Sequence, residues 1–154
     1  MINSEHVIDK IEKIISLIVP EIDTPWDYGV GFPLFYAEIQ FIMVIKANEG
    51  ANASSLARAI HVTGGAVSQI AGKLLKKGLI ESYRLPDNRK EVFFRLTKSG
   101  EKVYHDHQKH ITKTGNAFIN FLDGLNQKEI YTINNFLDLW IKGVTDFYKP
   151  VRKH

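Results

Sequence analysis

NASSLARAIHVTGGAVSQIAGKLLKKG, residues 52–78, has the pattern of two short helices joined by a tight corner. Asn52 and Thr63 are suitable N-caps, because their side-chain oxygens can accept from unpaired amides in a first helical turn. Gly78 stands where a helix commonly ends in left-handed backbone. Apolar residues recur at helical spacing in both segments: Leu56, Ile60, Val67, Ile70 and Leu74.

The other face of the second helix consists of small and hydrogen-bonding residues: Gly64, Gly65, Ser68, Gln69, Gly72, Lys73 and Lys76. A helix-interior glycine costs about 1 kcal/mol relative to alanine, so an ordinary surface helix would avoid this composition. Short side chains let a helix axis sit close to base edges in the major groove of DNA. Gln69 can bond adenine bidentately, while Thr63, the first amides and Lys73 suit phosphates. The alternative is a polar, solvated face.

Residues 79–96 predict a β-hairpin. The runs LIESYRL (79–85) and EVFFRL (91–96) flank PDNRK (86–90), in which Pro86-Asp87-Asn88 supplies the turn chemistry. Val92, Phe94 and Leu96 alternate, which predicts that one face packs on the helices. Arg84, Arg89 and Lys90 are expected near the tip, where they can reach an adjacent minor groove. The alternative is a solvated turn.

This order of motifs resembles the MarR family of winged helix-turn-helix regulators. The most specific stretches are LARAIHVTGGAVSQIAGKLLKKGLI (56–80) and RLTKSG (95–100), and the resemblance extends in layout to the whole chain. It implies an obligate homodimer on pseudo-palindromic double-stranded DNA. It also implies a repressor that often releases DNA when a small ligand binds.

The wing departs from the family pattern. The family commonly carries Asp-x-Arg, with its Arg seven residues before the Thr of the LT pair. Counted back from Thr97, those two positions hold Asn88 and Lys90, and Asp87-Asn88-Arg89 has matching residue types one place early. The departure leaves open whether Arg89 or Lys90 makes the DNA contact.

Composition excludes several classes of protein. The 154 residues contain no cysteine, which removes disulfides, thiolate metal sites and cysteine redox switches. No run of some 20 apolar residues and no signal-peptide pattern is present, so we expect a cytoplasmic protein with no membrane association. The net charge is +3, but residues 51–102 hold ten Lys and Arg against four Asp and Glu. That concentration suits a DNA-binding region.

The flanking segments predict long amphipathic helices. The N-terminal helix has one stripe of isoleucines: Ile8, Ile11, Ile15 and Ile18. The last two helices carry further stripes that include Thr114, Phe118, Trp140 and Tyr148. This apolar surface exceeds what a small winged domain can cover, so we expect dimerisation. The predicted fold is mainly α with a small β wing, a single domain over 1–154. Residues 37–99 form its winged helix-turn-helix, and the helices in 1–19 and 100–150 dimerise. The alternative is a monomer that folds its ends onto its own core.

Two further sites are suggested. The segment 20–40 carries aromatic residues that could line an effector pocket or instead seal a dimer core: Trp26, Tyr28, Phe32, Phe35 and Tyr36. His107 and His110, at i and i+3, could share a regulatory metal with Glu38, although solvated histidines are the commoner outcome. No metal or cofactor is required.

The leading hypothesis is a dimeric, sequence-specific transcriptional regulator, a ligand-responsive repressor. The alternatives are a metal-responsive regulator of the same fold and a winged-helix protein-interaction module that does not bind DNA. An enzyme is not expected, because no nucleophile–base set, P-loop or dinucleotide-binding glycine motif is present.

Overall fold

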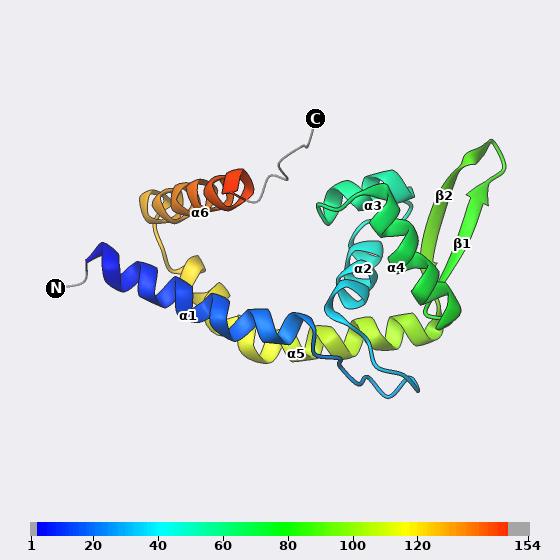
Figure 1. Cartoon of the computed structure of the whole chain (residues 1–154), viewed down its shortest axis with the longest axis horizontal. Helices are drawn as coiled ribbons and strands as arrows, with labels where there is room; N and C mark the ends of the chain where they lie inside the picture. Colours follow the sequence, from blue (N-terminus) through cyan, green and yellow to red (C-terminus); the bar gives the residue numbers. More distant parts are fainter. Residues whose placement is uncertain (1–2, 148–154) are drawn as a thin grey trace. The chain divides into compact units, whose positions relative to one another are not determined.

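The computed structural model describes residues 3–147, except the side chains of residues 113–115. It divides into two compact units, residues 1–109 and 110–154, and the boundary falls within one helix. The elements, in chain order, are α1 (Ser4–Ile22), α2 (Tyr36–Ala47), α3 (Ala53–Ala59), α4 (Gly64–Lys76), β1 (Ile80–Leu85), β2 (Asn88–Leu96), α5 (Lys98–Asp123) and α6 (Gln127–Phe147) (Figure 1). The predicted fold class, mainly α with one antiparallel hairpin, is confirmed.

The hydrophobic core of the first unit joins α2, α3, α4 and the hairpin. Phe41 and Ile42 of α2 are fully buried, as are Leu56 of α3 and Leu74 of α4. The Phe41 ring meets the Phe94 ring of β2 edge-on at 5.8 Å. Burial of these faces, worth about 1.5–3 kcal/mol for each large side chain, fixes how the helices and the wing are arranged.

The corner between α3 and α4 forms as predicted. The Asn52 side chain accepts from the Ser55 amide and the Thr63 side chain accepts from the Ala66 amide, so both residues are N-caps. His61, in the turn, has a φ of 55°. Histidine enters this left-handed region more readily than most residues other than glycine, and the conformation reverses the chain within four residues.

The motifs GLI and LTKSG mark a close backbone contact. Gly78 has a φ of 63° and ends the α4 segment. Thr97 donates its hydroxyl to the Gly78 carbonyl at 2.7 Å, and its amide donates to the Leu79 carbonyl at 3.0 Å. A Cβ on Gly100 would lie 2.0 Å from the Leu79 carbonyl oxygen, so only glycine fits there.

The hairpin differs from the sequence prediction in two ways. The second strand begins at Asn88 and not at Glu91, so the turn is Pro86–Asp87 and Asn88, predicted in the turn, belongs to β2. The expected alternation is also incomplete, because Phe93 (6% exposed) is buried as well as Phe94 (7%). Phe93 stacks on Tyr83 at 5.5 Å, and its backbone pairs with that of Asn52, the N-cap of α3.

The helix boundaries at both ends of the loop between α1 and α2 also differ from the sequence prediction. α1 passes through Pro20 and ends at Ile22, where the sequence predicted a loop from residue 20. Pro20 lies in the last turn, and the Thr24 hydroxyl donates to its carbonyl at 3.0 Å, which closes the helix end. Phe35 is the N-cap of α2, so Tyr36 is helical and not part of the loop.

Many apolar residues of the long helices are exposed, although Val103 of α5 is fully buried. α1 and α6 contain no buried residue among those described. Asn126 and Glu129 form a capping box at the start of α6: the Asn126 amide donates to Glu129 Oε2 at 2.9 Å, and the Glu129 amide donates to Asn126 Oδ1 at 3.1 Å. The Thr114 side chain and Tyr148, which the sequence placed on apolar stripes, lie outside the described residues, as do residues 148–150 of the predicted dimerisation part. None of the helices in residues 3–147 has the length and hydropathy needed to cross a bilayer.

Candidate DNA-binding surface

One side of α4 is buried and the other is open. Val67, Ala71 and Leu74 lie in the core. On the opposite face, the N-cap and six of the seven predicted residues are exposed, and Gly72 is half-buried. The exposed residues are Thr63, Gly64, Gly65, Ser68, Gln69, Lys73 and Lys76. An exposed helix in the second position of a helix-turn-helix is the element that enters the major groove.

The glycines of this face are not required by packing within the chain. Among the described residues, a Cβ on Gly64 or Gly72 would meet nothing within 4 Å, and one on Gly65 would meet only the Thr63 hydroxyl oxygen at 3.9 Å. None of the three has a positive φ. The helix therefore gives up stability at these positions without an internal packing or backbone reason.

The polar groups of the face are largely available to a partner. Ser68 donates its hydroxyl to the Gly64 carbonyl at 3.0 Å, which leaves its oxygen free to accept. In the described part of the chain, the side chains of Gln69 and Lys73 have no hydrogen-bond or ion-pair partner. An amide that donates and accepts, beside an ammonium group, suits a base edge next to a phosphate.

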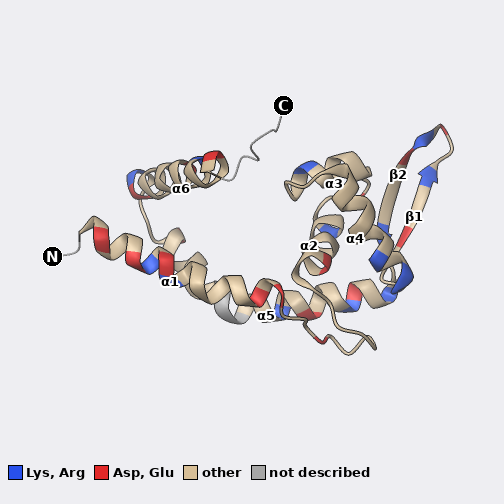
Figure 2. Cartoon of the chain, in the orientation of Figure 1, with Lys and Arg blue, Asp and Glu red and all other residues tan. Residues whose placement is uncertain are grey.

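The wing adds a second basic area. Figure 2 shows basic residues at the C-terminal end of α4 and near the tip of the hairpin. Arg84 donates to the Arg89 carbonyl across the hairpin. The Arg89 and Lys90 side chains are exposed and, among residues 3–147, unpaired. Both remain available to an anionic partner.

A bridge of three side chains, which the sequence did not predict, joins the wing to α3. The Asn52 amide nitrogen donates to Glu91 Oε1 at 2.6 Å, and the Asn88 amide nitrogen donates to Glu91 Oε2. We call this the wing bridge. Asn52 was identified only as an N-cap, and nothing near it in sequence indicated that its second polar atom would meet a residue 39 positions away.

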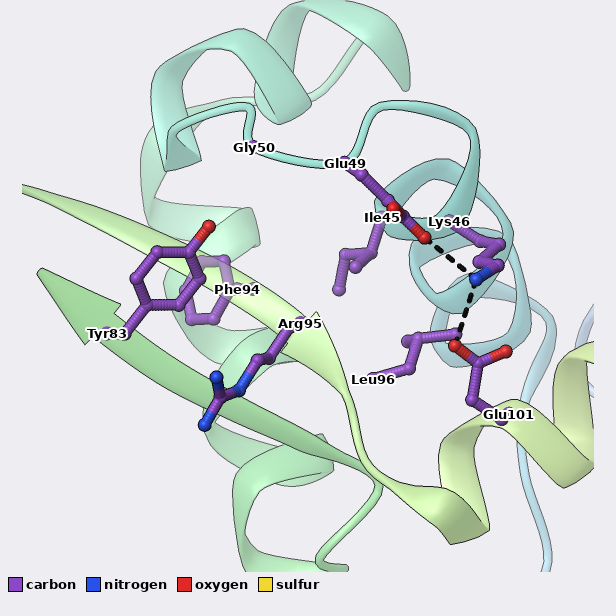
Figure 3. Close-up of a pocket in the computed structure, with 9 residues that line it drawn as sticks. All are labelled: Ile45, Lys46, Glu49, Gly50, Tyr83, Phe94, Arg95, Leu96 and Glu101. Carbon is purple, nitrogen blue, oxygen red and sulfur yellow. Dashed lines mark hydrogen bonds and ion pairs between the residues drawn. The ribbon is translucent and has the colours of Figure 1, made fainter. Parts of the chain in front are cut away.

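A cleft of about 440 Å³ lies at the base of the wing (Figure 3). Lys46 projects between Glu49 and Glu101, at 2.7 and 3.0 Å, and these hydrogen bonds raise the pKa of the ammonium group. Arg95 pairs with Glu81 at 2.7 Å and lies over the Tyr83 ring. The cations of this cleft are neutralised within the chain, so it does not extend the basic surface.

The predicted effector residues do not gather in one place. Trp26 stacks on Tyr28 with 6.4 Å between ring centroids, and the Tyr28 hydroxyl lies 2.7 Å from His107 Nδ1. Phe32 lies under Lys77, whereas Phe35 and Tyr36 are exposed. Burial, and secondarily the charge of Asp106, raises the pKa of Tyr28 to about 12. Trp26 and Tyr28 therefore share one environment beside His107, and the Phe32 ring lies beside Lys77 instead.

The three metal candidates have other partners. Glu38 is 2% exposed and accepts from Lys77 at 2.7 Å and from the Phe35 amide at 3.0 Å. His107 contacts Tyr28, and His110 also has an interaction within the chain. Among the described residues, no group of three or more His, Cys, Asp and Glu has the spacing of a metal site.

Comparison with known proteins places these features in a family. Residues 36–92 match the model of the MarR family. The chain is 36% identical over 106 residues to the HTH-type transcriptional regulator PchR of Bacillus subtilis, covering 69% of this chain but only 63% of PchR. It is 30% identical over 105 residues to the uncharacterised HTH-type transcriptional regulator YvnA of the same organism, covering 68% of this chain and 67% of YvnA.

The fold is also that of a solved regulator. The structure of Streptococcus pneumoniae FabT in complex with DNA superposes with a TM-score of 0.68 at 23% identity, covering 94% of this chain and 99% of FabT. At that identity the likeness establishes the winged helix-turn-helix fold.

Proposed function

This chain belongs to the MarR family of winged helix-turn-helix transcriptional regulators, and we propose that it acts as a cytoplasmic homodimer that represses transcription from a pseudo-palindromic operator. The family is one of regulators and not of enzymes. In this proposal the DNA-contacting residues are Thr63, Gly64, Gly65, Ser68, Gln69, Lys73, Arg84, Arg89 and Lys90.

The observation that carries the proposal is the open face of α4. Three helical glycines there lack any internal contact that would exclude alanine. A partner that approaches the helix backbone closely gives a reason for them, and the floor of the major groove is such a partner. The complex of FabT with DNA supports the same use of the fold.

A second copy of the chain is the proposed cover for the long helices. Phe118 of α5 is 71% exposed in the single chain, and Leu17 of α1 and Leu139 of α6 are also exposed. Many large apolar side chains exposed along the same helices normally mark an interface. We assign dimerisation to the helices within 1–19 and 100–150 and DNA binding to residues 37–99. The two copies of α4 would then meet half-sites about one helical turn, roughly 34 Å, apart.

A small-molecule effector would act by shifting the population of dimers whose recognition helices have the DNA-binding spacing. The loop between α1 and α2, with Trp26 and Tyr28 against His107 of α5, is the place we favour for it. Phe32, which lies beside Lys77, and the exposed Phe35 and Tyr36 remain candidates for the same pocket.

The test is a titration of the purified protein against the DNA that flanks its own gene, at several salt concentrations. A specific complex should weaken as the salt concentration rises. The slope of a plot of the logarithm of the binding constant against the logarithm of the salt concentration, called the salt slope below, should fall by about 0.9 for each phosphate neutralised. Selection from a random DNA pool should recover a palindrome. Failure to bind any sequence, or binding that ignores salt, would contradict the proposal and favour a protein-interaction module.

A further inference from the structure

The wing bridge fixes the start of β2 to the N-terminus of α3. Glu91 receives one amide on each carboxylate oxygen, from Asn52 at 2.6 Å and from Asn88. The backbones of Asn52 and Phe93 also pair, so the contact between α3 and the wing continues along the strand. Arg89 and Lys90 lie between Asn88 and Glu91 and are therefore held by the same bridge.

The central side chain of the bridge must accept a hydrogen bond on each of its two terminal atoms. The Asn52 amide oxygen accepts from the Ser55 amide at 2.8 Å, and the Asn88 amide oxygen accepts from the Glu91 amide at 3.3 Å. These bonds orient both asparagines so that their NH₂ groups face Glu91. A carboxylate can accept from both, whereas a glutamine would turn its own NH₂ toward one of them.

Electrostatics alone disfavours an acidic residue at this position. Glu91 follows Arg89 and Lys90 on the wing, where it would repel the phosphates that those cations attract. On charge grounds, neutralising Glu91 should strengthen DNA binding. An acidic residue that binding depends on must therefore contribute through geometry.

We propose that Glu91 is a positioning residue for DNA binding: its carboxylate holds the wing against α3, so that Arg89 and Lys90 point toward the duplex. This inference rests on the proposed function. In this chain the wing bridge would take the place of the Asp–Arg contact that the family commonly has in its wing, because Asn88 stands at the position of that Asp.

A matched pair of variants separates geometry from charge. Glu91→Gln and Asp87→Asn each remove one negative charge from the wing with almost no change in size, and Asp87 has no side-chain partner among the described residues. Asp87→Asn should leave operator affinity unchanged or raise it. Glu91→Gln should lower affinity by about fivefold or more, and it should reduce the salt slope by about 0.9 for each phosphate that the wing cations no longer reach.

Two further variants keep the test decisive. Asn88→Ala breaks the bridge without changing charge and should weaken binding in the same direction as Glu91→Gln, so it carries the test if Glu91→Gln does not fold. When Arg89 and Lys90 are both alanine, Glu91→Gln should no longer weaken binding, because the side chains that it positions are gone.

The outcomes also separate this inference from the proposed function. Wild-type protein that binds no DNA would overturn the function. Wild-type protein that binds, with Glu91→Gln behaving like Asp87→Asn, would overturn the role of Glu91 alone. A loss of affinity in Glu91→Gln that persists after Arg89 and Lys90 are removed would overturn it too, because that loss would not act through the wing cations.

Discussion

Replacing Gly65 with alanine should make the protein more stable and a weaker DNA binder. Gly65 is in the first turn of α4, its φ is not positive, and an added Cβ would have only the Thr63 hydroxyl oxygen nearby, at 3.9 Å. Alanine therefore enters without strain. It should raise the free energy of unfolding by about 0.4–1 kcal/mol, mainly by reducing the conformational freedom of the unfolded chain.

The effect on DNA binding should have the opposite sign. If α4 lies in the major groove with its backbone close to base edges, the new methyl group occupies space that the duplex needs. Overpacking of this kind costs about 1–3 kcal/mol, which corresponds to roughly a fivefold to hundredfold loss of affinity. Urea unfolding gives the stability change, and fluorescence anisotropy with labelled operator gives the affinity.

Asn135→Ala is the matched control, because exposed Asn135 lies within α6 and the substitution stabilises a helix by a similar few tenths of a kcal/mol. It should raise stability and leave DNA affinity unchanged. A stabilised Gly65→Ala that binds operator as tightly as wild type would refute the reasoning, since the open face of α4 would then not approach the duplex closely.

Three other substitutions test separate parts of the structure. Lys77→Ala leaves the buried Glu38 carboxylate without its cation. Because the Lys77 side chain is itself 22% exposed, we expect the free energy of unfolding in urea to fall by only about 2–3 kcal/mol. A fall below about 0.5 kcal/mol would show that the pair does not stabilise the fold. Tyr28→Phe removes the hydrogen bond to His107 and should cost about 1 kcal/mol near pH 7. The raised pKa of Tyr28 means that the unfolded chain ionises first, so wild-type stability should fall as pH rises from about 10 through about 12. The variant should show a flatter decline over that range, and an identical decline would contradict the assignment. Phe118→Glu should weaken the proposed dimer by about 2–3 kcal/mol in sedimentation equilibrium, while Asn135→Glu on the polar side of α6 should not; equal behaviour of the two would place the interface elsewhere.

Much of the winged helix-turn-helix could be predicted because its signals are local. The caps at Asn52 and Thr63 and the glycine stop at Gly78 depend on backbone groups within four residues. The two faces of α4 follow from helical periodicity in the same way. The wing was predicted less accurately, because its contacts include residues distant in the sequence. Phe93 stacks on Tyr83 and pairs its backbone with Asn52, and Glu91 accepts from Asn52.

The aromatic residues between α1 and α2 have partners that are distant in the sequence. Five aromatic residues within eleven positions suggested one pocket, yet Tyr28 turned to His107, 79 residues away, and Phe32 to Lys77. Glu38, considered as a metal ligand, is instead buried with Lys77 at a separation of 39 residues. Nothing in the neighbourhood of any of these residues encodes its partner.

The chain's own pattern of caps, glycines and apolar spacing is enough to specify two helices, their corner and the exposed small-residue face, because each feature is set by neighbours one or two turns away. The tertiary structure alone decides which distant segments contact one another. It gives Glu91 its two asparagines, closes the Leu79 carbonyl onto Gly100 and pairs Glu38 with Lys77. Each of these contacts joins groups that are distant in the sequence and meet only when the chain packs, so no period along the sequence predicts it.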